Sequence, residues 1–285
     1  MSFFIAEVSS NHSKDLNRAI QFIDSASEIG CDAVKFQLFK IDKLFAPEIL
    51  EKSKNHRERK NWELPLDFLP VLHERCLKNK IQFSCTPFYL DAVSQLEPYV
   101  SFYKIASYEL LWDDLLKECA LTKKPVIIST GMANIEEIKH AVSVLRKNNC
   151  EPRVLHCTSA YPTPHNEANL KAIDTIRKEL KCEMGWSDHT VNPGVIYRAI
   201  NKWDAKVIEF HLDLDGKGDE YDSGHCWLPD KIKSVIKNIK NGQEADGHGN
   251  KEPVESELSD RMWRTDKTDG LRPIKSIRKN FNVEN

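Results

Sequence analysis

The sequence predicts a (β/α)8 barrel, or TIM barrel, followed by a short C-terminal extension. Apolar, strand-like runs alternate with helix-like segments eight times between residues 1 and 241. Strict alternation requires parallel strands joined by helical crossovers, and eight such units close a barrel. An open doubly wound sheet is the lesser alternative, because the sequence has neither a G-x-G-x-x-G nor a Walker-type loop.

Each element is predicted from its local pattern of apolar residues. The strand-like runs are 3–8, 32–37, 81–85, 101–105, 125–129, 153–157, 182–187 and 206–212. The helical patterns are 16–29, 66–79, 89–96, 111–122, 134–148, 167–180, 193–203 and 229–241. Residues 39–63 interrupt the alternation with the charged run K-S-K-N-H-R-E-R-K, which indicates a solvated excursion or a lid. Residues 242–285 are too short and polar for an independent domain, so we expect a barrel over 1–241 and an extension over 242–285.

Composition excludes several classes of protein. The net charge is −2, and Lys and Arg are dispersed without a basic stripe, so nucleic acid is not an expected partner. The N-terminus has no basic leader, and no apolar run is long enough to cross a membrane, so we expect a cytoplasmic protein without a membrane partner. Eight cysteines without a C-x-x-C pair indicate reduced core thiols.

Polar residues gather where the predicted strands end, which is the edge of a barrel that carries catalysis. Two of these strands end on histidines, His189 in W-S-D-H and His211 in E-F-H-L, with Asp188 and Glu209 close by. Such a group can hold a divalent metal and leave positions open for substrate. The alternative is that both histidines serve as ordinary hydrogen-bonding residues.

Lys35 and Lys104 each lie inside an apolar strand, in A-V-K-F and F-Y-K-I. A lysine that faces a barrel interior is costly unless its charge is met. No acidic residue adjoins either lysine in the sequence, so we expect a bound phosphate or carboxylate as the partner, ringed by Ser and Thr hydroxyls. The alternative is that both side chains extend outward to water between the helices.

Eight motifs follow one another between about residues 4 and 230. They are I-A-E-V-S-S-N-H, A-V-K-F-Q, S-C-T-P-F, Y-K-I-A-S-Y-E, I-I-S-T-G-M, L-H-C-T-S-A-Y-P-T-P, G-W-S-D-H-T and E-F-H-L-D. Together they resemble the sialic acid synthase (N-acetylneuraminate synthase, NeuB-like) family. That family has a (β/α)8 barrel and condenses phosphoenolpyruvate with an N-acyl amino sugar, such as N-acetylmannosamine or a 6-deoxy diacetamido relative. The resemblance implies a nine-carbon ulosonic acid as the product, release of phosphate, and a divalent metal, Mn²⁺ or Mg²⁺.

The resemblance also implies roles for individual residues. The implied metal ligands are His189 and His211. The residues implied to surround phosphoenolpyruvate are Lys35, Thr86, Lys104, Ser107, Ser129 and Ser187. Those implied to face the sugar are Glu109, Tyr161 and Asp222. Ser159, which stands where the family often has an asparagine, is a further candidate for binding the substrate. Those implied to lie near the metal and the reacting carbons are Glu7 and Gln37.

Glu109 is the hypothesis for the proton-transfer group, and Glu7 is the alternative. Two other classes of function remain open at this point. One is a Schiff-base aldolase with Lys104 as the nucleophile, and the other is a non-catalytic phosphosugar-binding relative. The resemblance also implies a homodimer.

The sequence departs from the family pattern at its C-terminal end. Family members usually carry an antifreeze-like domain there, which offers an arginine to the sugar site of a second subunit. Residues 242–285 are expected to be too short for that domain. Arg264 and Arg272 are therefore candidates for a substitute cation, and the alternative is a tail packed outside the barrel.

Overall fold

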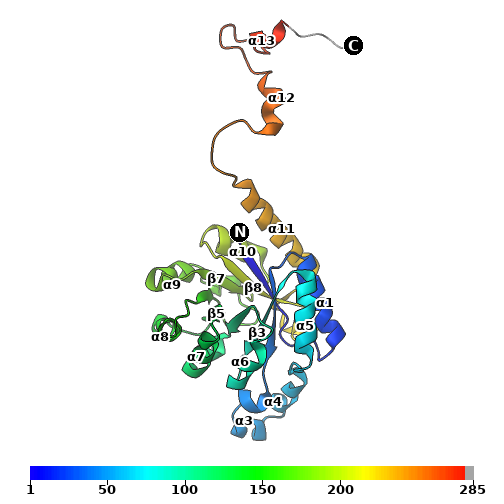
Figure 1. Cartoon of the computed structure of the whole chain (residues 1–285), viewed down its shortest axis with the longest axis vertical. Coiled ribbons are helices and arrows are strands. Elements are labelled where there is room, and N and C mark those ends of the chain that lie inside the picture. Colours follow the sequence, from blue (N-terminus) through cyan, green and yellow to red (C-terminus); the bar gives the residue numbers. More distant parts are fainter. Residues whose placement is uncertain (280–285) are drawn as a thin grey trace. The chain divides into compact units, whose positions relative to one another are not determined.

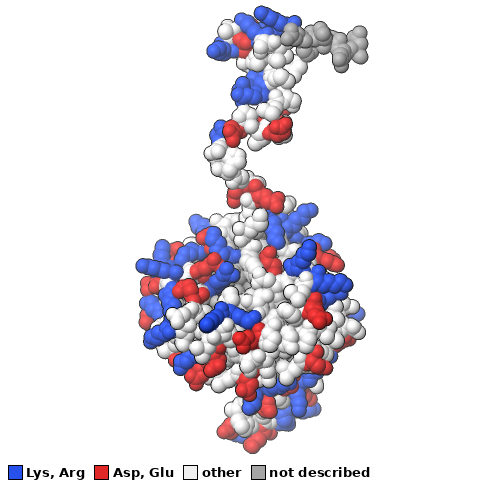
Figure 2. Space-filling model, in the orientation of Figure 1, with Lys and Arg blue, Asp and Glu red and all other residues white. Residues whose placement is uncertain are grey.

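The computed structural model describes residues 1–279, which form two compact units, Met1–Gly242 and the segment that begins at Gln243. Within residues 1–279, none of the helices combines the length and the apolar character that a bilayer crossing needs. On the face of the first unit seen in Figure 2, acidic and basic side chains are interspersed. This face therefore carries no broad patch of one sign.

The first unit is a closed barrel of parallel strands surrounded by helices, which confirms the predicted fold class (Figure 1). Each strand pairs with the next one in the sequence, and β1 also pairs with β8, which closes the sheet. The barrel strands are β1 (Phe3–Glu7), β2 (Ala33–Leu38), β3 (Gln82–Pro87), β4 (Phe102–Ile105), β5 (Val126–Ser129), β6 (Arg153–His156), β7 (Met184–Asp188) and β8 (Val207–Leu212). A further strand, β9 (Cys226–Trp227), pairs with β8 and was not predicted, because two residues are too few to show a period.

Amphipathic helices follow the strands. They are α1 (Leu16–Glu28), α5 (Phe68–Asn79), α6 (Leu90–Leu96), α7 (Asp113–Leu121), α8 (Ile135–Lys147), α9 (Ala172–Leu180), α10 (Pro193–Asn201) and α11 (Pro229–Ala245). Helix α8 shows why they form where they do. The Asn134 side chain accepts hydrogen bonds from the backbone of Glu136 and Glu137, and the Glu137 carboxylate accepts one in return from the Asn134 N–H. This capping box begins the helix, and its apolar face packs on the barrel.

The insertion after β2 is helical. It consists of α2 (Ile41–Leu44), α3 (Pro47–Lys52), α4 (Lys54–Glu58) and a 3-10 turn, η1 (Arg59–Trp62). Glu63, at its end, accepts hydrogen bonds from the Ile41 N–H and from Lys40 Nζ, so both ends of the insertion are tied together. The sequence predicted an excursion here but not its helices.

The barrel interior has an apolar floor below a polar layer. The floor is a separate buried cluster of Ile5, Ala33, Phe102, Ile127, Leu155 and Val207. Side chains on one strand alternate between its two faces, so the residue two positions later points into the same interior. Those residues are Glu7, Lys35, Lys104, Ser129, Cys157 and Glu209. Two residues further along these strands, the side chains in the barrel interior therefore change from apolar and closely packed to mostly polar or charged.

Gly185 in β7 lies between β6 and β8 at the level of this floor. A Cβ at this position would lie 2.4 Å from both Leu155 Cδ2 and the Val207 carbonyl oxygen. Glycine is therefore needed for the strands to carry large apolar side chains on either side of it.

The second unit contains short helical turns within its described residues. They are η5 (Glu255–Glu257), α12 (Leu258–Arg261) and α13 (Lys275–Arg278). Both candidate arginines bond within this segment: Arg264 Nε donates to the Arg261 carbonyl oxygen at 3.1 Å, and Arg272 Nε donates to Thr265 Oγ1 at 3.4 Å. A role for either in the site stays a prediction.

Candidate functional site

The carboxyl ends of the strands surround a cavity of about 770 Å³. Most of the residues that the sequence predicted for the site line it. They are Glu7, Lys35, Gln37, Lys104, Ser107, Glu109, Ser129, Tyr161, Ser187, His189 and His211. They come from different strands and loops, so the barrel, and not any local segment, assembles the site.

Three predicted residues do not line the cavity. Thr86 lies just beneath it, where its hydroxyl accepts a hydrogen bond from Lys35 Nζ at 3.1 Å. Ser159 is half-buried beside Gly131, and a Cβ on that glycine would lie 2.1 Å from the Ser159 hydroxyl. Asp222 is exposed to solvent. Asp219 and Glu220, from the same loop as Asp222, line the cavity instead.

Both predicted lysines are buried in the cavity floor, so the alternative in which they extend outward to water is wrong. Lys35 forms an ion pair with Glu7, and Glu209 lies 3.9 Å from it. Lys104 Nζ lies 3.4 Å from Glu209 Oε1 and donates to Ser129 Oγ at 2.6 Å. These carboxylates correct the expectation that a bound anion must supply the lysines' partner. They were missed because β1 lies beside β2, and β8 lies beside β1, only in the closed barrel.

Burial and pairing act in opposite directions on these groups. Burial alone would lower the pKa of Lys35, but Glu209 and Glu7 outweigh it and raise that pKa. For Lys104, burial prevails over Glu209, and its pKa is lowered. Burial alone would raise the pKa of Glu209, but Lys104 and Lys35 hold it below its usual value. The polar layer above the apolar floor is therefore a buried, charge-balanced cluster whose ammonium groups still face the cavity.

Glu109 lies on the cavity wall in η2 (Ser107–Glu109), directly after β4. Burial raises its pKa to about 7, and Lys104 counteracts only part of this effect. Its Oε2 is buried without a hydrogen-bond partner among the described residues. A carboxyl group with these properties can give or accept a proton near neutral pH.

His189 and His211 lie together at one side of the cavity, with ring centroids 5.3 Å apart. The His189 Nδ1 is hydrogen-bonded to the Thr158 carbonyl oxygen at 2.8 Å, which leaves Nε2 free to bind a metal. Burial, together with His211, lowers the pKa of His189 to about 3, so this ring stays neutral, as a metal ligand must. The Tyr161 ring packs against both histidines.

Asp188 does not join the histidines, although it precedes His189 in the chain. Its carboxylate accepts hydrogen bonds from the indole N–H groups of Trp186 and Trp227, both at 3.0 Å. It also accepts one from the Thr190 hydroxyl at 2.7 Å. Asp188 therefore fastens the end of β7 to β9 and is not available to a metal.

The insertion forms an aromatic wall of the cavity that the sequence did not reveal. The residues of this wall, including Phe39 directly after β2 and Phe88 directly after β3, are Phe39, Leu44, Phe45, His56, Arg59, Trp62 and Phe88. The Arg59 guanidinium lies over two rings, 5.6 Å from the centroid of Phe45 and 5.3 Å from that of Trp62. Within residues 1–279, no carboxylate forms an ion pair with Arg59. The only sequence signal was a charged run, which is typical of a solvated face.

Comparison with known proteins agrees with this architecture. The model of the NeuB family matches residues 22–251, which is most of the chain. The chain belongs to the NeuB family. The family resemblance expected from the motifs is thereby confirmed.

Three named synthases are similar to this chain over nearly its whole length. An N,N'-diacetyllegionaminic acid synthase of Campylobacter jejuni is 36% identical over 272 residues, which cover 90% of this chain and 80% of that protein. A pseudaminic acid synthase of the same species is 30% identical over 273 residues, covering 92% of this chain and 79% of that protein. The crystal structure of an N-acetylneuraminic acid (sialic acid) synthetase from Leptospira borgpetersenii has a TM-score of 0.79 at 31% identity, and covers 91% of this chain and 90% of that one.

The donor set at the cavity wall suits the divalent metal that the family resemblance implies. His189 presents Nε2, and His211 is joined by Glu220, His225 and Cys226, whose ligand atoms lie within 4.8 Å of one another. Imidazole nitrogens and a carboxylate are ordinary ligands of divalent transition metals. Sequence reasoning missed Glu220 and His225 because they lie in a loop without periodicity. The available signal was that this loop follows the strand of His211.

Proposed function

We propose that this member of the NeuB family condenses phosphoenolpyruvate with an N-acyl amino sugar, such as N-acetylmannosamine or a 6-deoxy diacetamido relative. The product is a nine-carbon ulosonic acid of the sialic acid type, and phosphate is released. The observation that carries this proposal is a single cavity with two ammonium groups and several hydroxyls at its floor and a cluster of imidazoles beside them. Its volume lies within the range typical of small-molecule sites.

Phosphoenolpyruvate is an anion at both ends and fits the cavity floor. Lys35 and Lys104 reach the cavity beside the hydroxyls of Ser107, Ser129 and Ser187. In a buried site these groups form charge-assisted hydrogen bonds with carboxylate and phosphate oxygens. Thr86 acts from below by holding the Lys35 ammonium group.

The amino sugar occupies the outer part of the cavity in this proposal. Tyr161 and Gln37 line it there with polar atoms, and the aromatic wall of the insertion offers an apolar surface for an N-acyl group or a 6-deoxy carbon. Ser159 and Asp222 serve the sugar only if binding brings their side chains nearer. Their role stays a prediction from the family resemblance.

The reaction joins C3 of the enol phosphate to the aldehyde carbon of the open-chain sugar. His189 and His211 would hold the divalent cation, which would supply Lewis acidity to the reaction. Attack leaves an oxocarbenium at C2, which the nearby Glu7 and Glu209 carboxylates stabilise. Water adds at C2 and gives up a proton, and the alkoxide formed from the aldehyde takes one up. The resulting hemiketal phosphate then breaks its bond between C2 and the phosphate oxygen, which releases phosphate and gives the ketone.

Glu109 is the better candidate for the proton-transfer group. Its carboxyl has a pKa of about 7 and a buried oxygen without a partner among residues 1–279. The Glu7 carboxylate is occupied by the ion pair with Lys35 and by a hydrogen bond from Gln37 Nε2 at 2.7 Å. A group that is held in this way orients its neighbours, whereas a free carboxyl can transfer protons.

A phosphate-release assay with phosphoenolpyruvate, Mn²⁺ or Mg²⁺, and a panel of N-acyl hexosamines tests the proposal. We expect release that depends on both substrates, and a loss of at least about 100-fold in turnover for Glu109→Gln. The exposed Glu118→Gln on α7 is the matched control and should turn over normally.

The assay also separates the other classes of function. A Schiff-base aldolase that used Lys104 would form an adduct with substrate that borohydride traps, and this adduct would contradict the proposal. A non-catalytic relative would bind phosphoenolpyruvate without releasing phosphate from it in the presence of any of the sugars.

A further inference from the structure

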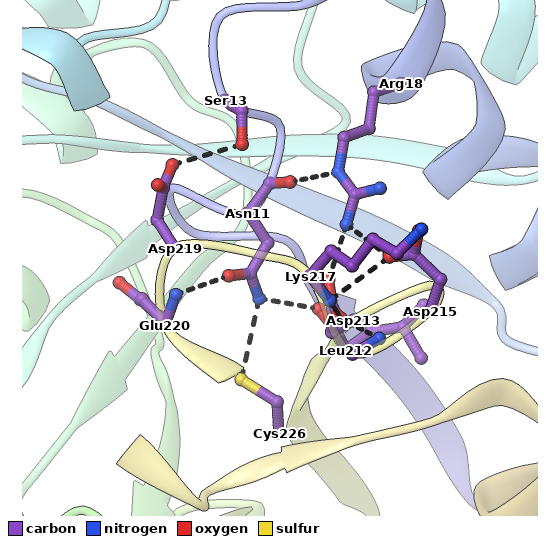
Figure 3. A network of polar contacts seen from close by, with 11 residues as sticks. Asn11, Ser13, Arg18, Leu212, Asp213, Asp215, Lys217, Asp219, Glu220 and Cys226 are labelled. Carbon is purple, nitrogen blue, oxygen red and sulfur yellow. Dashed lines mark hydrogen bonds and ion pairs between the residues drawn. The ribbon is translucent and has the colours of Figure 1, made fainter. Parts of the chain in front are cut away.

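The loop between β8 and β9, residues 213–225, is held in one shape by a polar network (Figure 3). Asp213, buried at its start, accepts hydrogen bonds from the backbone N–H groups of Gly216 and Lys217 at 2.6 and 3.1 Å. Arg18 on α1 holds both Asp213 and Asp215, at 2.8 and 2.9 Å. The buried carboxylate of Asp213 and the two ion pairs of Arg18 therefore fix the conformation of this loop.

Asn11, in the loop after β1, fixes the next part of the segment. Its side-chain N–H donates to the Leu212 carbonyl oxygen at 3.0 Å, and its side-chain oxygen accepts from the Glu220 N–H at 2.8 Å. Gly218 makes this contact possible, since a Cβ there would lie 2.5 Å from the Asn11 oxygen and 2.3 Å from Asp213 Oδ1. The backbone of Glu220 is thereby pinned at the cavity.

The Glu220 side chain turns toward the histidines. Its Oε1 accepts hydrogen bonds from Ser9 and Ser10, at 2.5 and 3.1 Å. Its Oε2 lies 3.3 Å from His211 Nδ1 and 3.5 Å from His225 Nε2. His225 is almost fully buried, and its other ring nitrogen has no hydrogen-bond partner among residues 1–279. The Glu220 carboxylate therefore lies between two buried imidazole nitrogens, His211 Nδ1 and His225 Nε2, and these are donor types that share a divalent cation.

We propose that Glu220 and His225 join His211 and His189 as direct ligands of one divalent cation, in a site of three imidazoles and one carboxylate. The ring centroids are 4.6 Å apart for His211 and His225, 5.3 Å for His189 and His211, and 6.3 Å for His189 and His225. Because a metal–imidazole bond is about 2.1 Å long, two rings on one ion have centroids roughly 4.5–6.5 Å apart. All three separations lie in this range.

This ligand set selects a class of metal. Three neutral imidazoles favour divalent transition metals such as Mn²⁺, Fe²⁺, Co²⁺ or Zn²⁺, whereas Mg²⁺ prefers an all-oxygen shell and keeps its waters. Cys226 lies in the same group, but its Sγ already accepts a contact from Asn11 Nδ2 at 3.5 Å. The proposed set consists of the three imidazoles and the Glu220 carboxylate.

The inference rests on the proposed function for the role of the cation, so its test measures binding and not turnover. The full chain is stripped with a chelator and titrated with Mn²⁺, Zn²⁺ or Mg²⁺. We expect one tight Mn²⁺ or Zn²⁺ per chain and Mg²⁺ bound at least 100-fold more weakly. Glu220→Gln and His225→Gln should each weaken Mn²⁺ binding at least tenfold. The matched controls are the exposed Glu167→Gln and His165→Gln on η3 (His165–Glu167), which should stay within twofold.

X-ray absorption of the Zn²⁺-loaded wild-type chain counts the ligands directly and needs no variant to fold. We expect scattering from three imidazoles and light atoms, and from two imidazoles in His225→Gln. Two imidazoles in the wild type, a sulfur in the first shell, or unchanged affinity in both variants would each overturn the assignment. If phosphate is released but neither variant changes Mn²⁺ affinity, the proposed function holds and the ligand assignment fails. If the expected ligands are found but no phosphate is released, the metal site holds and the proposed function fails.

Discussion

Glu109→Gln should make the protein more stable at alkaline pH while it removes activity. Glutamine keeps the size and shape of the side chain but cannot ionise. The wild-type carboxyl is buried and has a pKa of about 7 in the folded chain, against 4.5 for an ordinary glutamate. Keeping that group charged inside the cavity wall therefore destabilises the fold, and glutamine removes this burden.

The magnitude follows from proton linkage. Between pH 4.5 and about 7 the folded chain binds this proton more tightly than the unfolded chain does, so the stabilising contribution is complete below pH 4.5 and is lost as the pH rises through 7. The shift corresponds to about 3 kcal/mol of unfolding free energy, as an upper limit. For a chain of this size this equals roughly 5–10 °C in Tm.

Thermal denaturation at pH 5 and pH 8 measures this effect. We expect the Tm of Glu109→Gln minus that of the wild type to increase by several degrees from pH 5 to pH 8. Glu118→Gln, exposed on α7, should show the same small difference at both values. If the Tm difference for Glu109→Gln does not depend on pH, the carboxyl has an ordinary pKa and the reasoning about proton transfer fails with it.

Three other substitutions test the packing around the site. Gly218→Ala should lower Mn²⁺ affinity at least tenfold in a titration, because its Cβ would come within 2.3 Å of a carboxylate oxygen in the clamped loop. Gly185→Ala should lower the free energy of unfolding by about 1–3 kcal/mol, measured as a lower urea midpoint at an unchanged m-value, because the barrel floor has no room for a methyl group. Lys35→Met should cost about 3–5 kcal/mol in the same assay, because it removes a buried partner of Glu7 and Glu209.

The fold was predictable because its signals are local. Each barrel strand is a short apolar run, and each helix carries its own apolar face, so the alternation is visible without knowledge of contacts. The polar layer was predictable for the same reason. Lys35 and Lys104 stand out as charges within apolar strands, and both prove to face the cavity.

The partners of these residues were not predictable from local pattern. Glu7 faces Lys35 because β1 and β2 pair in that register, and Glu209 reaches both lysines only after β8 closes on β1. The position of Glu220 depends on Asn11 and Gly218, which come from different ends of the barrel sequence. The sequence of a loop without periodicity does not predict in which direction its side chains point.

The charge of the cavity implies that the metal and phosphoenolpyruvate bind in a linked way. The charged groups that line it are Lys35, Arg59 and Lys104 against Glu7, Glu109, Glu209, Asp219 and Glu220. The carboxylates outnumber the cations, although the enol phosphate brings its own carboxylate and a phosphate of roughly −1.5 to −2 charge. A divalent cation held at Glu220 would cancel this excess of negative charge.

We therefore expect phosphoenolpyruvate to bind the Mn²⁺-loaded chain at least tenfold more tightly than the chelator-stripped chain, as measured by calorimetry at one ionic strength. Thermodynamic linkage requires that phosphoenolpyruvate tighten Mn²⁺ by the same factor. The Glu220→Gln variant is the internal check, because it removes one negative charge from the stripped cavity and should bind phosphoenolpyruvate without metal better than the wild type does. Equal affinity for phosphoenolpyruvate with and without Mn²⁺ would contradict this expectation. It would mean that Lys35 and Lys104 bind the anion without help from the metal, despite the carboxylates beside them.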